Sequence, residues 1–190
     1  MFTLVCVGDV IEPEGAASEF ETSDTTALSI SLSLTRRAQN AVSGPLFDYY
    51  YRVVGASGKS LLSLEIKSGA LVTVELISKP PAVTTRSGAI YHRPAEIVTR
   101  EPVFALGFSE SDCKVDCARK YLDEYRDFEL VAFDNGVRLS ISEAPPFSAV
   151  RIGESLYLEL GEREDLCAIA LEDATGELPR SLMASAAMRI

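Results

Sequence analysis

Tyr91, His92 and Arg93 are the residues of this sequence best suited to acid–base chemistry or to anion binding. His92 is the only histidine, and Arg86 and Arg100 stand nearby in the sequence. An imidazole beside a guanidinium could transfer protons or donate to an anion. No serine, cysteine or carboxylate forms a recognisable catalytic pattern around His92, so we assign no catalytic residue. The simplest interpretation is a solvated loop with a stacking contact. Among functional roles, we favour contact of these five residues with an anionic ligand or a partner.

Cys113 and Cys117 are the second candidate group, because residues four apart on a helix would place both sulfur atoms on one face. A structural zinc site takes four ligands, usually in closely spaced pairs. The other possible ligands are Cys6, Cys167 and His92, and each stands alone in an expected strand or loop. Free cysteine packs as a small hydrophobic side chain. We therefore expect Cys113 and Cys117 in the core, and we expect no metal and no cofactor.

Residues 53–62 contain Gly58, Lys59 and Ser60, a combination that also ends the phosphate-binding loop of nucleotide hydrolases. That loop starts with a glycine, follows a strand and leads into a helix. Here the starting position is Val53, and strand-like sequences lie on both sides of the segment. We therefore expect the glycine turn of a hairpin, with its lysine in solvent.

The sequence is acidic, with a formal net charge of −10 over 190 residues. Residues 1–58 sum to −4, residues 59–108 to +2 and residues 109–190 to −8, so a basic segment separates two acidic ones. This charge disfavours binding to nucleic acid or to anionic membranes and favours a basic protein partner. The acidic runs lack the spacing of a calcium loop. Their first expected role is solubility, and their second is electrostatic steering of a basic partner.

The sequence also carries few signals of targeting or of disulfide bonds. Its first residues have no basic region before the apolar ones, and no stretch approaches the roughly 20 apolar residues of a membrane helix. Four cysteines are too few for a disulfide scaffold. We expect a cytoplasmic protein with free thiols and without a membrane segment.

One principal amphipathic helix is expected at about residues 110–127. Ser109 and Asp112 have the spacing of a capping box, which satisfies the first backbone N–H groups of a helix. Apolar side chains then recur at three- or four-residue steps, as on a helix that packs against a sheet. They are Cys113, Cys117, Tyr121, Tyr125 and Phe128.

Most of the remaining chain alternates apolar and polar residues between turn signals, which predicts β-strands. In the aromatic strand, Tyr49 and Tyr51 are expected on one face and Tyr50 on the other. Asn135-Gly136 and Gly153-Glu154 predict tight hairpin turns. Residues 12–26 and 79–94 are expected as long loops. The expected strands are residues 2–8, 27–35, 48–54, 60–66, 70–78, 95–100, 102–108, 128–134, 137–142, 149–152, 155–160 and 166–173.

These elements predict a mainly β (α+β) protein, an antiparallel barrel or sandwich of hairpins with one helix packed on the sheet. We expect a single domain over residues 1–190, with a division near residues 108 and 109 as the alternative. The expected function is a non-catalytic intracellular protein-interaction module with an acidic surface, such as an inhibitor or immunity-type protein that masks a basic partner.

The alternative function is a β-barrel that binds a small anionic ligand through the basic segment 79–100. An enzyme ranks third, and its activity would depend on His92 with partners supplied by the fold. A homo-oligomer formed through a sheet edge is compatible with all three possibilities.

Overall fold

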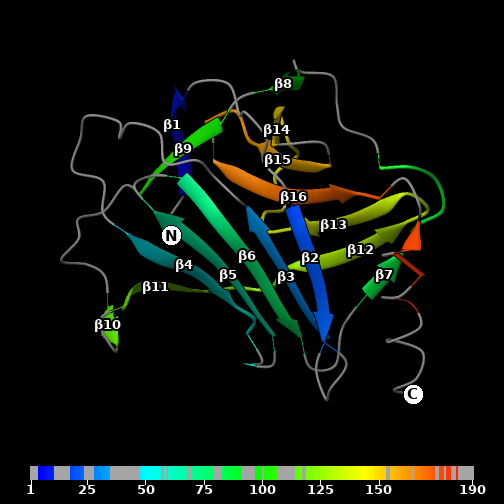
Figure 1. Ribbon diagram of the computed structural model, residues 1–190, viewed down its shortest axis with the longest axis horizontal. Helices are drawn as coiled ribbons and strands as arrows, with labels where there is room; N and C mark the ends of the chain where they lie inside the picture. The colour runs from blue at the N-terminus through cyan, green and yellow to red at the C-terminus, as the bar shows by residue number, and fades with distance from the viewer. Residues whose placement is uncertain are drawn as a thin grey trace.

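The computed structural model contains two β-sheets (Figure 1), and strand residues far outnumber helical residues in the part of the chain that it describes. The predicted mainly β class is confirmed. Within the described part of the chain, no helix has the length and apolar character needed to cross a membrane. The structure describes residues 4–10, 18–23, 28–34, 48–56, 58, 60–67, 70–78, 83–90, 97–99, 101–106, 114–116, 119–152, 155–163, 165–173, 176–177, 179–180 and 183.

Sheet A has nine strands. They are β1 (Leu4–Val10), β2 (Ser18–Ser23), β3 (Leu28–Leu34), β4 (Tyr49–Val54), β5 (Ser60–Lys67), β6 (Ala70–Ser78), β9 (Glu101–Leu106), β10 (Lys114–Asp116) and β11 (Arg119–Tyr125). Their order is β1-β9-β6-β5-β4-β11-β10, while β3 pairs with β6 and β2 pairs with β3.

Sheet B has seven strands in the order β7-β12-β13-β16-β15-β14-β8. They are β7 (Val83–Thr85), β8 (Ile97–Thr99), β12 (Glu129–Phe133), β13 (Gly136–Ser140), β14 (Ser148–Ile152), β15 (Leu156–Leu160) and β16 (Leu166–Glu172). The central strand β16 therefore lies between β13 and β15, so it joins two hairpins that precede it in the sequence.

Both sheets are mixed, and neither closes into a barrel, so the predicted barrel alternative is wrong. Most neighbouring strands are antiparallel, as predicted, but β11 runs parallel to β4, β12 to β7 and β14 to β8. Side chains of the two sheets meet in one hydrophobic core, where Leu62 and Leu64 of sheet A and Leu158 of sheet B are fully buried. Burial of this apolar surface is the main stabilising contribution to the fold.

The meander of β4, β5 and β6 follows the sequence pattern closely. Alternating residues point to opposite faces of a strand, and Tyr49 and Tyr51 are buried at 4% and 1% exposure while Tyr50 is only partly covered. The predicted division of the three tyrosines is confirmed. Between β4 and β5, Gly58 has φ of 67° and its N–H donates to the Gly55 carbonyl at 2.7 Å, which forms the predicted glycine turn.

The hairpin of β12 and β13 forms as predicted, but its turn lies one residue earlier. Phe133 pairs with Gly136, so the two turn residues are Asp134 and Asn135. Gly136 is required for a different reason. A Cβ at this position would lie 2.2 Å from the carbonyl oxygen of Leu171, so only glycine allows β13 to approach β16 this closely.

The predicted helix over residues 110–127 is wrong, because its described residues form β10 and β11. The physical reason is an ambiguity of spacing. Residues four apart share one face of a helix, but they also share one face of a strand. Tyr121 and Tyr125 fit both patterns, and in β11 they lie on the outer face while Leu122 and Glu124 are buried. Pairing with β4, which is distant in the sequence, decides in favour of the strand.

Candidate functional site

The structure places one of the five predicted site residues. Arg86 is exposed directly after β7, where its backbone N–H donates to the Ala132 carbonyl oxygen at 2.9 Å. Tyr91, His92, Arg93 and Arg100 lie outside the described residues. Their convergence with Arg86 on an anionic ligand therefore stays a prediction.

The cysteines are spread over the fold as far as the structure describes them. Cys6 lies on β1 opposite Phe104, and Cys167 lies on β16 with 1% exposure. Cys113 and Cys117 lie outside the described residues, so their predicted core position is untested. Among the residues that the structure describes, no group of three histidine, cysteine or acidic side chains is arranged to hold a metal ion.

The thiol of Cys167 is held in its protonated form. Burial raises its pKa from 9.0 to about 11, and the Asp165 carboxylate, 3.7 Å from the sulfur, acts in the same direction. The unfolded thiol ionises at lower pH. The resulting contribution to stability is therefore complete below the unperturbed pKa of 9.0 and is lost as the pH rises toward the folded value.

We expect alkylation of Cys167 by iodoacetamide to be slow in the native protein, because the residue is 1% exposed and its raised pKa keeps the thiol protonated. In denaturant the same residue should react with the pH dependence of an ordinary thiol. Mass spectrometry of the peptide that contains Cys167 measures both rates. Native labelling as fast as that in denaturant at the same pH would contradict the burial and the raised pKa of Cys167.

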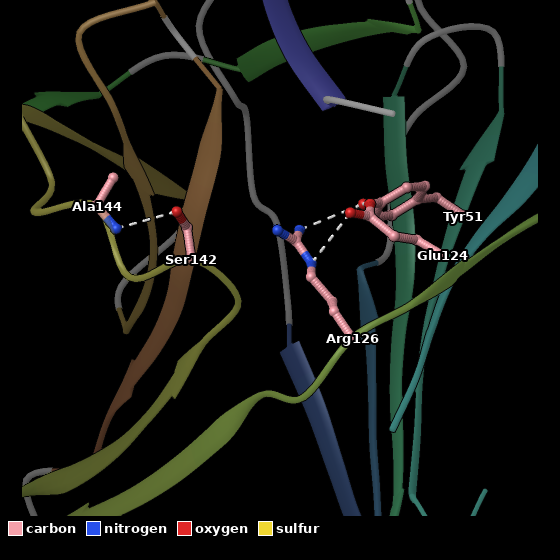
Figure 2. A network of polar contacts seen from close by, with 5 residues as sticks. All are labelled: Tyr51, Glu124, Arg126, Ser142 and Ala144. Carbon is pink, nitrogen blue, oxygen red and sulfur yellow. Dashed lines mark hydrogen bonds and ion pairs between the residues drawn. The ribbon is translucent and has the colours of Figure 1, made fainter. Parts of the chain in front are cut away.

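A polar network lies between the two sheets (Figure 2). The buried Tyr51 hydroxyl donates a hydrogen bond to Oε2 of Glu124, which is 8% exposed. Arg126 contacts both, with Nε 3.4 Å from Glu124 Oε1 and an Nη2 hydrogen bond of 3.4 Å to the Tyr51 oxygen. Burial first, and then the hydrogen bond to Glu124, raise the pKa of Tyr51. Arg126 thus supplies the counter-charge of the Glu124 carboxylate at the edge of an apolar core.

A second buried ion pair crosses the central strand of sheet B. Arg138 on β13 donates from Nε to Oε2 of Glu159 on β15 at 2.7 Å, and its second nitrogen lies 2.6 Å from the same oxygen. The Glu159 side chain is only 2% exposed. Ala168 and Ala170 on the intervening β16 are fully buried, so the long side chains lie over small ones. The positive charge of Arg138 is therefore compensated within the sheet by Glu159.

The outer face of sheet A carries a connected set of polar side chains around Glu65. Its two carboxylate oxygens accept hydrogen bonds from Tyr50 at 2.9 Å and Thr73 at 3.0 Å, and Lys67 lies 3.0 Å away. Partial burial opposes ionisation of Glu65, but the hydrogen bonds from Lys67, Tyr50 and Thr73 lower its pKa overall.

Beside this set, Arg52 is paired with Asp123 at 2.6 Å and lies 3.9 Å from the ring centre of Tyr121. Among the described residues of this face, Glu65 and Asp123 are thus each paired with a cation, while Glu75 is exposed.

One end of sheet B differs, because a ridge there separates two acidic grooves. The ridge is the β13–β14 loop, residues 141–147, and Ala144, Pro145 and Pro146 line both grooves. The first groove, of about 630 Å³, lies between the ridge and residues 127–129. The second, of about 450 Å³, lies between the ridge and the turn of residues 161–165. We call the ridge and its two grooves the acidic ridge surface.

Carboxylates outnumber cations on the acidic ridge surface. Its acidic residues are Asp127, Glu129, Glu143, Glu162 and Asp165, and its basic residues are Arg138 and Arg163. Arg138 is engaged by the buried Glu159, so Arg163 is the other cation that the described lining sets against these five carboxylates. The charges of the described lining residues therefore sum to a negative value, as those of the whole sequence do.

Hydrogen bonds fix the shape of this surface before any partner binds. Ser142 Oγ accepts from the Ala144 N–H at 3.1 Å at the start of the ridge (Figure 2), and the Phe147 N–H donates to the Leu160 carbonyl at 2.8 Å at its end. Asp127 Oδ1 accepts from the Ala56 N–H at 3.0 Å. The two prolines restrict the backbone between these points.

The arrangement provides fixed hydrogen-bond acceptors beside apolar surface, with no nucleophile–base pair among its described residues. Carboxylate and backbone acceptors of this kind can form charge-assisted hydrogen bonds with cationic groups. No protein-family model matches this chain, and no curated protein matches it.

Proposed function

We propose that the protein is a non-catalytic interaction module that binds a basic protein partner through the acidic ridge surface. An inhibitor or immunity-type protein that masks its partner is the specific form we favour. The observation that carries this proposal is the gathering of five carboxylates around two grooves and an exposed apolar ridge. Apolar contact area with charged groups beside it is the usual composition of a specific protein interface.

Among the described residues, ion pairing distinguishes the acidic ridge surface from most of the outer face of sheet A. On the outer face of sheet A, Arg52 and Asp123 neutralise each other, and Glu65 is engaged by Lys67. On the acidic ridge surface, Glu129, Glu143 and Glu162 are exposed. Exposed charges of one sign accelerate association with an oppositely charged partner and make it dependent on salt.

The proposal predicts that Glu143→Lys and Glu162→Lys, one change in each groove, weaken binding of the basic partner. Each reversal replaces an attraction with a repulsion, for which we expect a loss in affinity on the order of tenfold at low salt. The partner is first captured on the immobilised protein at low ionic strength and purified. Calorimetric titration at increasing salt then measures its affinity for each variant.

Glu75→Lys is the matched control, because Glu75 is an exposed glutamate on the outer face of sheet A. It changes the net charge equally and should weaken binding far less. If all three variants bind the captured protein equally, or if added salt leaves the affinity unchanged, the acidic ridge surface is not the binding site.

A further inference from the structure

We infer that the acidic ridge surface recognises an extended segment of its partner that carries arginine, and that it prefers arginine to lysine. This inference rests on the proposed function and makes its partner specific. It starts from Phe147, one of three large hydrophobic side chains that are exposed in the described part of the chain. Its exposed fraction is 60%. The ring lies at the end of the ridge and lines the second groove.

Carboxylates line the same groove as this ring. Glu162 is exposed and Asp165 is partly buried. The backbone of the turn closes through a hydrogen bond from the Gly161 N–H to the Asp165 carbonyl at 2.8 Å. A Cβ at position 161 would lie 2.6 Å from Asp165 Oδ1, so the glycine allows the carboxylate to fold over the turn. The acceptor is therefore held in place before a partner arrives.

An aromatic ring beside the fixed Asp165 carboxylate and the exposed Glu162 favours a guanidinium over an ammonium group. A guanidinium is flat, can stack on a ring and donates two parallel hydrogen bonds to a carboxylate at the same time. An ammonium is more strongly hydrated and offers a point charge without a flat face. The described charges of this groove, Glu162, Asp165 and Arg163, sum to −1, which makes stacking and geometry more important than charge alone.

The shape of the ridge indicates an extended partner segment. Ala144 and Pro145 are exposed between the two grooves, and proline lacks the N–H group that a docked strand would need to pair with. A bound segment therefore crosses the ridge by side-chain contacts. Its basic residues then reach Glu129 and Glu143 on one side and Glu162 on the other.

The test uses two fluorescein-labelled heptapeptides of alternating glycine and basic residues, one with arginine and one with lysine. Both carry equal charge, so charge alone predicts equal affinities. We expect the arginine peptide to bind the full chain about three- to fivefold more tightly by fluorescence anisotropy, the factor of an exposed cation–π contact. Phe147→Leu should abolish this preference, whereas Tyr125→Leu, at an exposed ring on sheet A, should keep it. Melting curves of both variants verify their folding.

Equal affinities for the two peptides, or a preference that survives in Phe147→Leu, would overturn the inference and leave the proposed function standing. The same holds if neither peptide binds but the captured basic partner remains sensitive to Glu143→Lys and Glu162→Lys. If the captured partner is insensitive to both charge reversals, the proposed function itself fails.

Discussion

Arg138→Met should lower the free energy of unfolding by about 3–5 kcal/mol, the usual cost of removing one member of a buried ion pair. The reason is the position of Glu159, whose side chain is 2% exposed and lies 2.6–2.7 Å from two nitrogens of Arg138. Methionine fills most of the volume of the arginine stem but provides no donor for the buried carboxylate. Urea denaturation followed by circular dichroism measures the loss.

Two further variants separate this effect from a loss of packing. In Arg138→Met/Glu159→Leu both charges are absent, and the double variant should recover most of the lost stability, since apolar pairs replace buried ion pairs at little cost. Arg163→Met is the control for removal of an exposed arginine and should change stability by less than about 0.5 kcal/mol. A loss below about 1 kcal/mol for Arg138→Met would show that other groups stabilise the Glu159 carboxylate.

Local sequence patterns predicted the hairpins, because a hairpin is specified by residues that are close together in the sequence. The alternation in β3 and in β4–β6, and the turns near Gly58 and Asn135, involve residues within a few positions of each other. The three parallel pairs are different. In each of them β4, β7 or β8 meets a strand that is far away in the sequence, and no spacing within one strand specifies its partner.

The error at residues 110–127 has the same origin. Tyr121 and Tyr125 were compatible with a helix and with a strand, and the evidence that decides between them is the register of β11 against β4. Glu124 shows what the helix prediction missed. On the solvent-exposed face of a helix a glutamate needs no partner, but in β11 Glu124 faces the core, where Tyr51 and Arg126 are its partners.

The acidic ridge surface could be predicted only in part. Glu162 and Asp165 belong to an acidic run that the sequence shows directly, and Pro145-Pro146 marks the loop between two hairpins. Their proximity could not be predicted, because the two grooves combine residues 127–129, the loop of residues 141–147 and the turn of residues 161–165. The strand order of sheet B brings these three connections to one end of the sheet.

Glu124→Ala should be the second strongly destabilising change, again with an expected loss of about 3–5 kcal/mol. The substitution removes the acceptor of the Tyr51 hydroxyl and the counter-charge of Arg126, and it leaves both groups between the sheets. Because Glu124 pairs in register with Val53 on β4, the loss acts on the parallel junction that holds β11 in sheet A. Chemical denaturation measures the change.

The network can be separated into its parts with two milder variants and one control. Tyr51→Phe removes only the hydroxyl and should cost about 1–3 kcal/mol, since it leaves the buried Glu124 carboxylate short of a donor. A double-mutant cycle of Tyr51→Phe with Glu124→Gln should give a coupling energy of about 0.5–3 kcal/mol. Glu129→Ala, at an exposed glutamate of the next strand, should change stability by less than about 0.5 kcal/mol. If Glu124→Ala were no worse than this control, the polar network would not stabilise the junction of β4 and β11, and the apolar contacts of Leu122 with the core would have to hold it alone.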